Sequence, residues 1–164
     1  MTEPSYDQLR AHATSIFACG NHSIHGPGHW RNVEDSFLLI APTAGADMVV
    51  GRLFAILHDC CRVDDESDLE HGPRAAKLIR SLAGVVINLD AARLDQLVFA
   101  VQHHTGGKLS EDPTIGACWD ADRLDLGRVG IIPSSTYMST QAGRDIATLG
   151  SKHLYLEKIK RPTP

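Results

Sequence analysis

Residues 48–57 constrain the fold more than any other part of the sequence, because Arg52 is the only charged side chain in an otherwise apolar run. A helix that is apolar on nearly all sides has to be buried. The run ends directly at His58 and Asp59, and burying an unpartnered carboxylate costs several kcal/mol. A metal cation is the simplest partner for an adjacent imidazole and carboxylate. The dipeptide alone leaves a hydrogen-bonded helix cap or an exposed pair as the alternative.

Helical periodicity dominates the rest of the chain. No segment shows the alternation typical of a strand beyond residues 85–87, which are too few to build a sheet. A chain of 164 residues has the length of one domain and can bury a core of its own without staples. We therefore predict a single all-α domain that spans residues 1–164 and contains about six or seven helices.

Turn and capping residues predict where the helices begin and end. Pro42 and Gly84 are expected to end two of them. Asp90 and Asp112 are expected to cap the starts of two others. Pro73 suits the first position of a helix, where its missing backbone N–H needs no partner. The expected helices include a first one that ends near residues 19–21, a central one over about residues 45–60, and a last one over about residues 138–149.

Composition and charge exclude several classes of function. The formal net charge of −4 argues against a nucleic-acid polymer as partner, although a local basic pocket for one phosphate ligand is compatible with it. No stretch approaches the roughly 18 uninterrupted apolar residues of a transmembrane helix, so we expect no membrane span. The first residues lack the pattern of a secretion signal, which predicts a cytoplasmic protein. The four cysteines show no C-x-x-C spacing and are expected to be core residues.

Polar side chains on otherwise apolar helix faces are the next signal. Helical spacing places Asp122 in the middle of the apolar stripe of its helix, whereas Asp120 is expected to point away from the core. A salt bridge or a helix cap is the alternative to a metal as the partner of Asp122. In the preceding helix, the same spacing turns His104 inward and His103 to the opposite side.

Further histidines lie at or near the starts of helices. His29 lies on one stripe with the apolar residues of its helix, whereas His25 precedes the glycine and proline that break the chain. We prefer His29 as a ligand and assign His25 a supporting or substrate-facing position. His71 stands directly before a Gly-Pro pair, where surface and functional histidines are equally common. Together, five helices or helix ends each offer an inward nitrogen or oxygen ligand, which predicts a shared metal centre.

The order His29, His58-Asp59, Asp122 resembles the HD superfamily of metal-dependent phosphohydrolases. In that family a helical domain gathers a histidine, a His-Asp dyad and a distal aspartate around a metal. Residues 29–33, 57–59 and 121–125 look like the three family signatures. The resemblance covers about residues 21–126 and implies an HD-type helical bundle. The part that follows is predicted to be a helical extension.

Residues 71–76 and 103–107 look like the additional histidine motifs of HD branches that hold two metals. By that similarity, His71 and His104 would ligate a second ion, and Asp59 would bridge both ions. The implied ligands come from separate helices or helix ends: His29, His58, Asp59, His71, His104 and Asp122. Nitrogen and oxygen ligands without thiolate suit one or two ions of Fe, Mn, Co, Ni or Zn, among which we favour Fe or Mn.

The resemblance implies a hydrolase that cleaves a phosphoester or phosphoanhydride of a small molecule, with a nucleotide expected, through a metal-activated hydroxide. His58 and Asp59 are the expected catalytic residues. Arg62 and Lys108 are the expected binding residues for substrate phosphate, ahead of Arg74 and Arg123, although each could equally be a solvated charge. A small phosphorylated substrate is the expected partner, and the sequence leaves a homodimer open.

Two other functions share these ligands. Some two-metal HD proteins are oxygenases, so a diiron centre that cleaves carbon-carbon or carbon-phosphorus bonds is the first alternative. Oxygen consumption with an organic substrate, and no action on phosphoesters, would favour it. The second alternative is a non-catalytic nucleotide-binding module. Tight nucleotide binding without turnover in any of these metals would favour that one.

Overall fold

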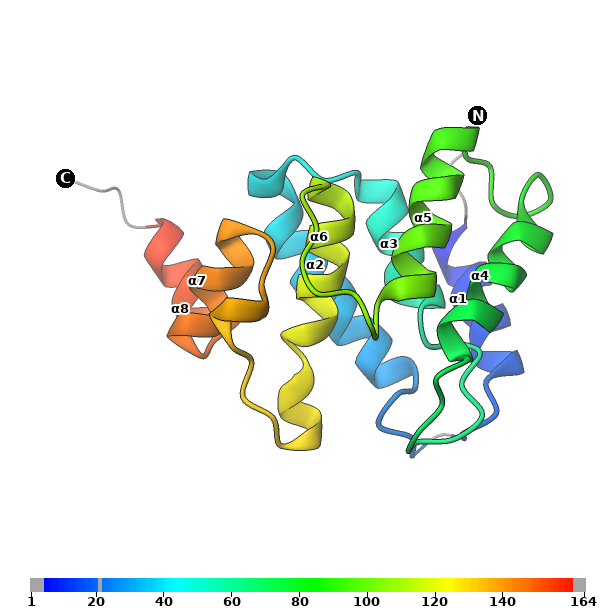
Figure 1. The fold of residues 1–164 in the computed structure, drawn as a ribbon, viewed down its shortest axis with the longest axis horizontal. Helices are drawn as coiled ribbons and strands as arrows, with labels where there is room; N and C mark the ends of the chain where they lie inside the picture. The colour runs from blue at the N-terminus through cyan, green and yellow to red at the C-terminus, as the bar shows by residue number, and fades with distance from the viewer. Residues whose placement is uncertain (1–4, 21, 161–164) are drawn as a thin grey trace.

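The computed structural model describes residues 5–20 and 22–160, and within them the chain is helical (Figure 1). It forms eight α-helices and two short 3-10 helices, with one isolated bridge between Ala83 and Ile87. The helices are α1 (Tyr6–Ile16), α2 (Pro27–Ala44), α3 (Met48–Leu57), α4 (His71–Leu82), α5 (Ala91–His103), α6 (Pro113–Arg123), η1 (Leu126–Val129), η2 (Ser135–Tyr137), α7 (Gln141–Leu149) and α8 (Lys152–Lys160). The all-α prediction is confirmed. The number exceeds six or seven because α8, which the sequence analysis did not predict, follows α7.

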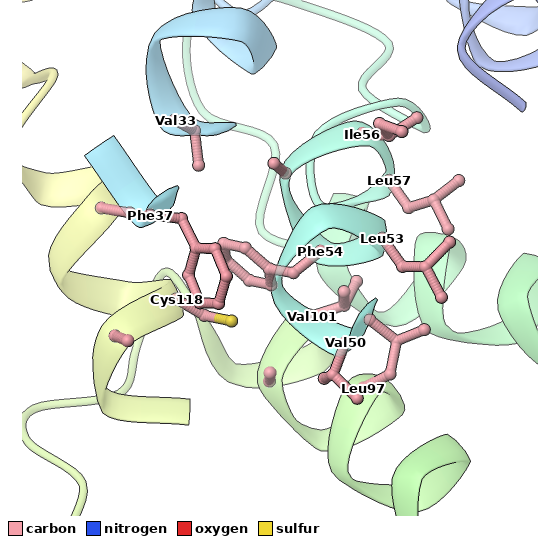
Figure 2. Close-up of a cluster of buried hydrophobic side chains, with 14 of the residues drawn as sticks. Val33, Phe37, Val50, Leu53, Phe54, Ile56, Leu57, Leu97, Val101 and Cys118 are labelled. Carbon is pink, nitrogen blue, oxygen red and sulfur yellow. The ribbon is translucent and has the colours of Figure 1, made fainter. Parts of the chain in front are cut away.

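Helix α3 is the centre of the bundle, as its apolar sequence predicts. It packs against α1, α2, α5 and α6, and Figure 2 shows side chains from several of these helices around it. The exception, Arg52, lies at the edge of α3, where it binds Glu34 at 2.8 Å and covers the ring of Tyr6. Gly51 lets α2 approach closely, because a Cβ atom there would lie 1.9 Å from Cζ of Phe37. The burial of α3 carries His58 and Asp59 into the interior.

Aspartate side chains cap three helices at their starts. Asp90 and Asp112 accept hydrogen bonds from the backbone of the first turns of α5 and α6, as predicted. Asp47 does the same for α3, where Val49 N and Val50 N donate to it. These caps satisfy N–H groups that have no partner within the helix. They therefore fix where the helices that carry the polar residues begin.

Two expected proline boundaries are wrong. Pro42 lies inside α2, which continues to Ala44 and ends at Gly45 with φ +70°. The left-handed glycine is the stronger C-terminal signal, since a proline in the last turn removes only one helical hydrogen bond. Pro73 lies in the first turn of α4 but not at its first position, because the helix already begins at His71. A missing N–H is acceptable anywhere in that turn.

The C-terminal helices lie on the side of α2 and α6 remote from α1 and α4 (Figure 1). The predicted last helix begins at Gln141, three residues later than expected, because the side chain of Thr140 caps it. The segment before it covers one side of α6 and fully buries Asp120, which we expected to point away from the core. No helix in the described part of the chain is both long and apolar enough to cross a membrane.

Candidate metal centre

Six side chains from five helices or helix ends meet beside the end of α3. His29 lies in the first turn of α2, and His71 begins α4. His58 and His104 directly follow the last residues of α3 and α5. Three overlapping groups of possible metal ligands occur here, and together they contain His29, His58, Asp59, His71, His104 and Asp122. The structure thus brings together all six ligands that the sequence predicts.

The first cluster contains His29, His58, Asp59 and Asp122. Nε2 of His29 lies 3.1 Å from Nε2 of His58, 3.2 Å from Oδ1 of Asp122 and 3.7 Å from Oδ2 of Asp59. Nε2 of His58 lies 3.6 Å from the same Asp59 oxygen and 3.8 Å from the Asp122 oxygen. Donor atoms bound to one ion at about 2.0–2.1 Å are separated by roughly 3.0–3.5 Å. The cluster is close to that size.

The second cluster contains His71, His104 and the other oxygen of Asp59. The two Nε2 atoms lie 2.9 Å apart. Oδ1 of Asp59 is 3.2 Å from Nε2 of His71 and 3.4 Å from Nε2 of His104. Asp59 therefore divides its oxygens between the two clusters, with Oδ2 in the first and Oδ1 in the second. That is the arrangement of a bridging carboxylate.

Hydrogen bonds fix the ring orientation of all four histidines. Nδ1 of His58 faces the carbonyls of Phe54 and Ala55 at 3.2 Å, and Nδ1 of His104 faces that of Val101 at 2.7 Å. Nδ1 of His71 bonds to a backbone carbonyl, and Nδ1 of His29 to a carboxylate oxygen, each of which can only accept. Each Nδ1 therefore carries the proton. In the neutral rings, every Nε2 presents a lone pair to the cluster.

This donor set fits a metal ion. Two unprotonated Nε2 atoms cannot hydrogen-bond to each other, yet those of His71 and His104 lie 2.9 Å apart. Nε2 of His29 and Nε2 of His58 lie 3.1 Å apart, a contact that requires either a second proton on one ring or a shared cation. A cation shared by the pair satisfies both lone pairs and the carboxylates beside them. Imidazole with carboxylate and no thiolate suits the first-row transition metals.

Burial and hydrogen bonding favour the metal-binding forms of the clusters. Burial lowers the pKa of His58 to about 3, so its imidazole is neutral. Burial also acts to lower the pKa of His29, but hydrogen bonds with Asp122 and Asp125 outweigh it and raise that pKa to about 9. Without metal, His29 is therefore protonated at neutral pH. A metal ion at this position takes the place of that proton.

The two carboxylates are held in the ionised form. Burial acts to raise the pKa of Asp59, but hydrogen bonds with the imidazoles of His104, His25 and His71 keep it well below its usual range. For Asp122, burial has the same direction and is outweighed by the hydrogen bond and charge of His29, which lower its pKa. Ionised carboxylates are the forms that ligate metals.

Asp125 is a site residue that the sequence analysis did not assign. Its Oδ2 lies 2.7 Å from Nδ1 of His29, and Asn32 donates to its Oδ1 at 3.1 Å. A carboxylate on the far nitrogen of a ligating imidazole fixes the ring and strengthens it as a ligand. The signal was its place three residues after Asp122, one helical turn along. His25 has a supporting position, with Nδ1 3.0 Å from Oδ2 of Asp59.

A cavity of about 250 Å³ opens onto the clusters. Arg62 lines it, with its Nε donating to Oδ1 of Asp59 at 3.3 Å. Arg123 lines it as well, whereas Lys108 is exposed and is not among its lining residues. Arg74 is held elsewhere, by the Cys61 carbonyl and Asp68. The complete lining is His25, Asp59, Arg62, His104, Thr105, Asp122, Arg123, Leu126 and Arg128.

A larger cavity, about 610 Å³, lies between the starts of α6 and α7. Of the described residues that line it, none belongs to the two clusters and none is a histidine or cysteine. It contains no set of metal ligands comparable to the smaller cavity. The smaller cavity is the one that combines the converging imidazoles and carboxylates with arginine side chains.

Comparisons with known proteins support the fold. No protein-family model matches the chain, and no curated protein matches it in sequence. A crystal structure of a predicted HD superfamily hydrolase from an uncultured Thermotogales bacterium is similar, with a TM-score of 0.71 and 20% sequence identity. The similarity covers 96% of this chain and 91% of that chain. The chain therefore has the fold of an HD superfamily protein.

Proposed function

We propose that the protein is a metal-dependent phosphohydrolase that cleaves a phosphoester or phosphoanhydride of a small molecule, with a nucleotide as the expected substrate. The observation that carries the proposal is the position of Asp59. One of its oxygens belongs to the first cluster and the other to the second cluster. Both clusters border a cavity that three arginines line. The HD fold of the chain supports the same proposal.

Divalent ions bound here would supply Lewis acidity and an activated hydroxide for in-line attack on phosphorus. We propose that all six imidazole and carboxylate ligands hold two ions, with Fe or Mn favoured. Asp59 fixes the relative position of the two clusters, because its carboxylate contacts both. Arg62 lies in the cavity wall with its guanidinium beside Asp59, where it can donate to a phosphoryl oxygen.

The arginines favour a phosphorylated substrate over the diiron oxygenase alternative. Arg62, Arg123 and Arg128 all line the cavity, and guanidinium groups match phosphate oxygens in charge and geometry. The ligands themselves do not separate the two reactions, because both use imidazole and carboxylate. The complete ligand set argues against a module that only binds nucleotide, for which six metal ligands would be superfluous.

The test is elemental analysis of the purified protein, followed by a screen of nucleotides and dinucleoside polyphosphates with the metal found. Asp59→Ala should lower both bound metal and hydrolysis to background while the helical circular dichroism signal remains. Asp95→Ala is the matched control, because Asp95 is an exposed helix residue whose ion pair with Arg80 lies at the surface. Hydrolysis that persists in Asp59→Ala would refute the assigned centre. Oxygen consumption without phosphoester cleavage would favour the oxygenase.

A further inference from the structure

Arg128 is an arginine of the cavity wall for which the sequence analysis gave no role. It lies in η1, after the helix that carries Asp122. Its side chain is 16% exposed and lines the same cavity as Asp59 and Asp122. A charged side chain that is mostly buried beside a metal centre needs partners for its donors.

Two of the three guanidinium nitrogens of Arg128 have backbone acceptors. Nε donates to the carbonyl of Ile24 at 2.9 Å, and Nη1 donates to the carbonyl of Asp125 at 3.1 Å. These bonds link η1 to the segment before α2, across the edge of the cavity. They hold the planar group in one orientation, so little conformational entropy remains to be lost when a ligand binds.

The third nitrogen, Nη2, lacks a suitable acceptor among the residues that the structure describes. The atom that lies near it is Nδ1 of His25, at 3.4 Å. The same Nδ1 lies 3.0 Å from Oδ2 of Asp59. Arginine can only donate and an ionised carboxylate can only accept, so one ring nitrogen cannot serve both. The shorter contact, to the carboxylate, uses the proton of Nδ1 and leaves the N–H groups of Nη2 for another acceptor.

The charges around the cavity also favour an anionic ligand. A single divalent ion offsets the charges of Asp59 and Asp122. Asp125 lies 4.0 Å from Nη1 of Arg128 and offsets one of the three guanidinium charges of the wall, so positive charge still remains to face a ligand. Arg62 donates to Asp59, and Arg123 donates to the carbonyls of Tyr137 and Gly107. Nη2 of Arg128, in contrast to both Nη groups of Arg123, has only the contested imidazole contact among the described residues.

We infer that Arg128 is a substrate-binding residue, whose Nη2 donates to a phosphoryl oxygen of the bound substrate. This assignment rests on the proposed phosphohydrolase function. It places anion recognition on η1, whereas the sequence analysis placed it on Arg62 and Lys108. Because the guanidinium is fixed by two carbonyls, a lysine at this position would keep the charge but lose the fixed orientation.

The experiment measures binding of inorganic phosphate to the metal-loaded protein by calorimetry, in the wild type and in Arg128→Gln, Arg128→Lys and Arg144→Gln. Arg144→Gln is the matched control, since Arg144 also donates to two backbone carbonyls but lines the other cavity. We expect Arg128→Gln to weaken phosphate binding about tenfold or more and Arg128→Lys to weaken it less. Metal content should stay at the wild-type level, and Arg144→Gln should bind phosphate like the wild type.

Unchanged phosphate affinity in Arg128→Gln, with metal content and melting temperature also unchanged, would overturn the inference. Loss of bound metal in that variant would overturn it too, because Arg128 would then act on the metal centre. If Arg128→Gln does not fold, Arg128→Lys decides, since wild-type affinity there would contradict the need for a guanidinium. A wild type that hydrolyses no phosphorylated compound but binds phosphate through Arg128 would refute the proposed function, and with it the substrate role of Arg128, while leaving Arg128 as an anion-binding residue.

Discussion

Helix α6 carries two aspartates, Asp120 and Asp122, whose carboxylates have opposite surroundings. The Asp120 carboxylate accepts three hydrogen bonds of 2.7 Å, from Ser139 N, Thr140 N and the Thr140 hydroxyl. The Asp122 carboxylate has imidazole nitrogens of His29 and His58 as its partners in the described part of the chain. One carboxylate is satisfied by the protein itself, and the other requires a proton or a cation.

The comparison shows why a buried carboxylate alone does not identify a metal site. Asp120 joins α6 to the start of α7 and has a structural role. Asp122 meets rings whose Nδ1 protons are already engaged, so a ring nitrogen that faces it can donate only after the ring takes up a second proton, as His29 does in the metal-free protein. The distinguishing feature is the kind of partner, because backbone N–H groups stabilise a carboxylate without any ion.

Replacing Asp122 by alanine should have the largest effect on the metal. Removing a ligand should lower metal affinity by more than the roughly 10–100-fold that loss of an outer hydrogen-bond partner costs. Elemental analysis after dialysis, together with a metal titration, measures this. The helical signal should persist. Full metal occupancy in Asp122→Ala would break the contrast with Asp120.

Asp120→Ala should instead reduce stability. The substitution leaves buried donors at Ser139 and Thr140 without an acceptor, which should lower the free energy of unfolding by about 2–4 kcal/mol. Urea unfolding of the metal-free protein measures the loss. Metal affinity should match the wild type under conditions where the variant is folded. If Asp120→Ala loses the metal and keeps its stability, the two carboxylates have been assigned the wrong roles.

Alkaline pH should destabilise the metal-free protein, because His29, the partner of Asp122, loses its proton. The pKa of His29 is raised to about 9 in the folded protein, against about 6.5 in the unfolded chain. A raised histidine pKa gives stability that is complete below about pH 6.5 and is lost as the pH rises through 9, by at most about 3 kcal/mol.

Urea unfolding at pH 6.5 and pH 9.5, after chelation of metals, measures this loss. His29→Gln should remove this contribution, and bound metal should reduce it, because the ion replaces the proton. A wild type and a His29→Gln variant with the same pH dependence would contradict the protonation of His29.

Asp125→Asn should have the smallest effect of the series. An amide in place of the carboxylate weakens the support of His29, which should lower metal affinity about 10–100-fold without unfolding the protein. Asn32→Ala is the control, because Asn32 touches the other oxygen of Asp125 and not the ring. Equal losses in the two variants would show that the contact with His29 has no specific role.

Much of this centre could be predicted from the sequence because its ligands lie on or next to helices. Helical spacing separates the buried His104 from the exposed His103, and the apolar sequence of α3 places His58 and Asp59 in the interior. The side of α6 that carries Asp122 is likewise apolar. Periodicity therefore identifies the inward ligands one helix at a time.

Loop geometry and the packing of remote segments could not be predicted in this way. Asp120 is buried by a segment almost 20 residues further on, and that contact leaves no periodic pattern in α6. Lys108 and Arg128 both follow helices, and spacing does not say which of them reaches the cavity. The structure places Arg128 in the wall and leaves Lys108 exposed.

Anomalous X-ray scattering from crystals of the metal-loaded protein tests the central claim most directly. The account predicts one strong peak about 2.0–2.3 Å from Nε2 of His29 and His58, and a second at a similar distance from Nε2 of His71 and His104. An oxygen of Asp59 should ligate each ion. Metal ions ligated only by other residues would contradict the account. The absence of a peak between these imidazoles at saturating metal would contradict it as well.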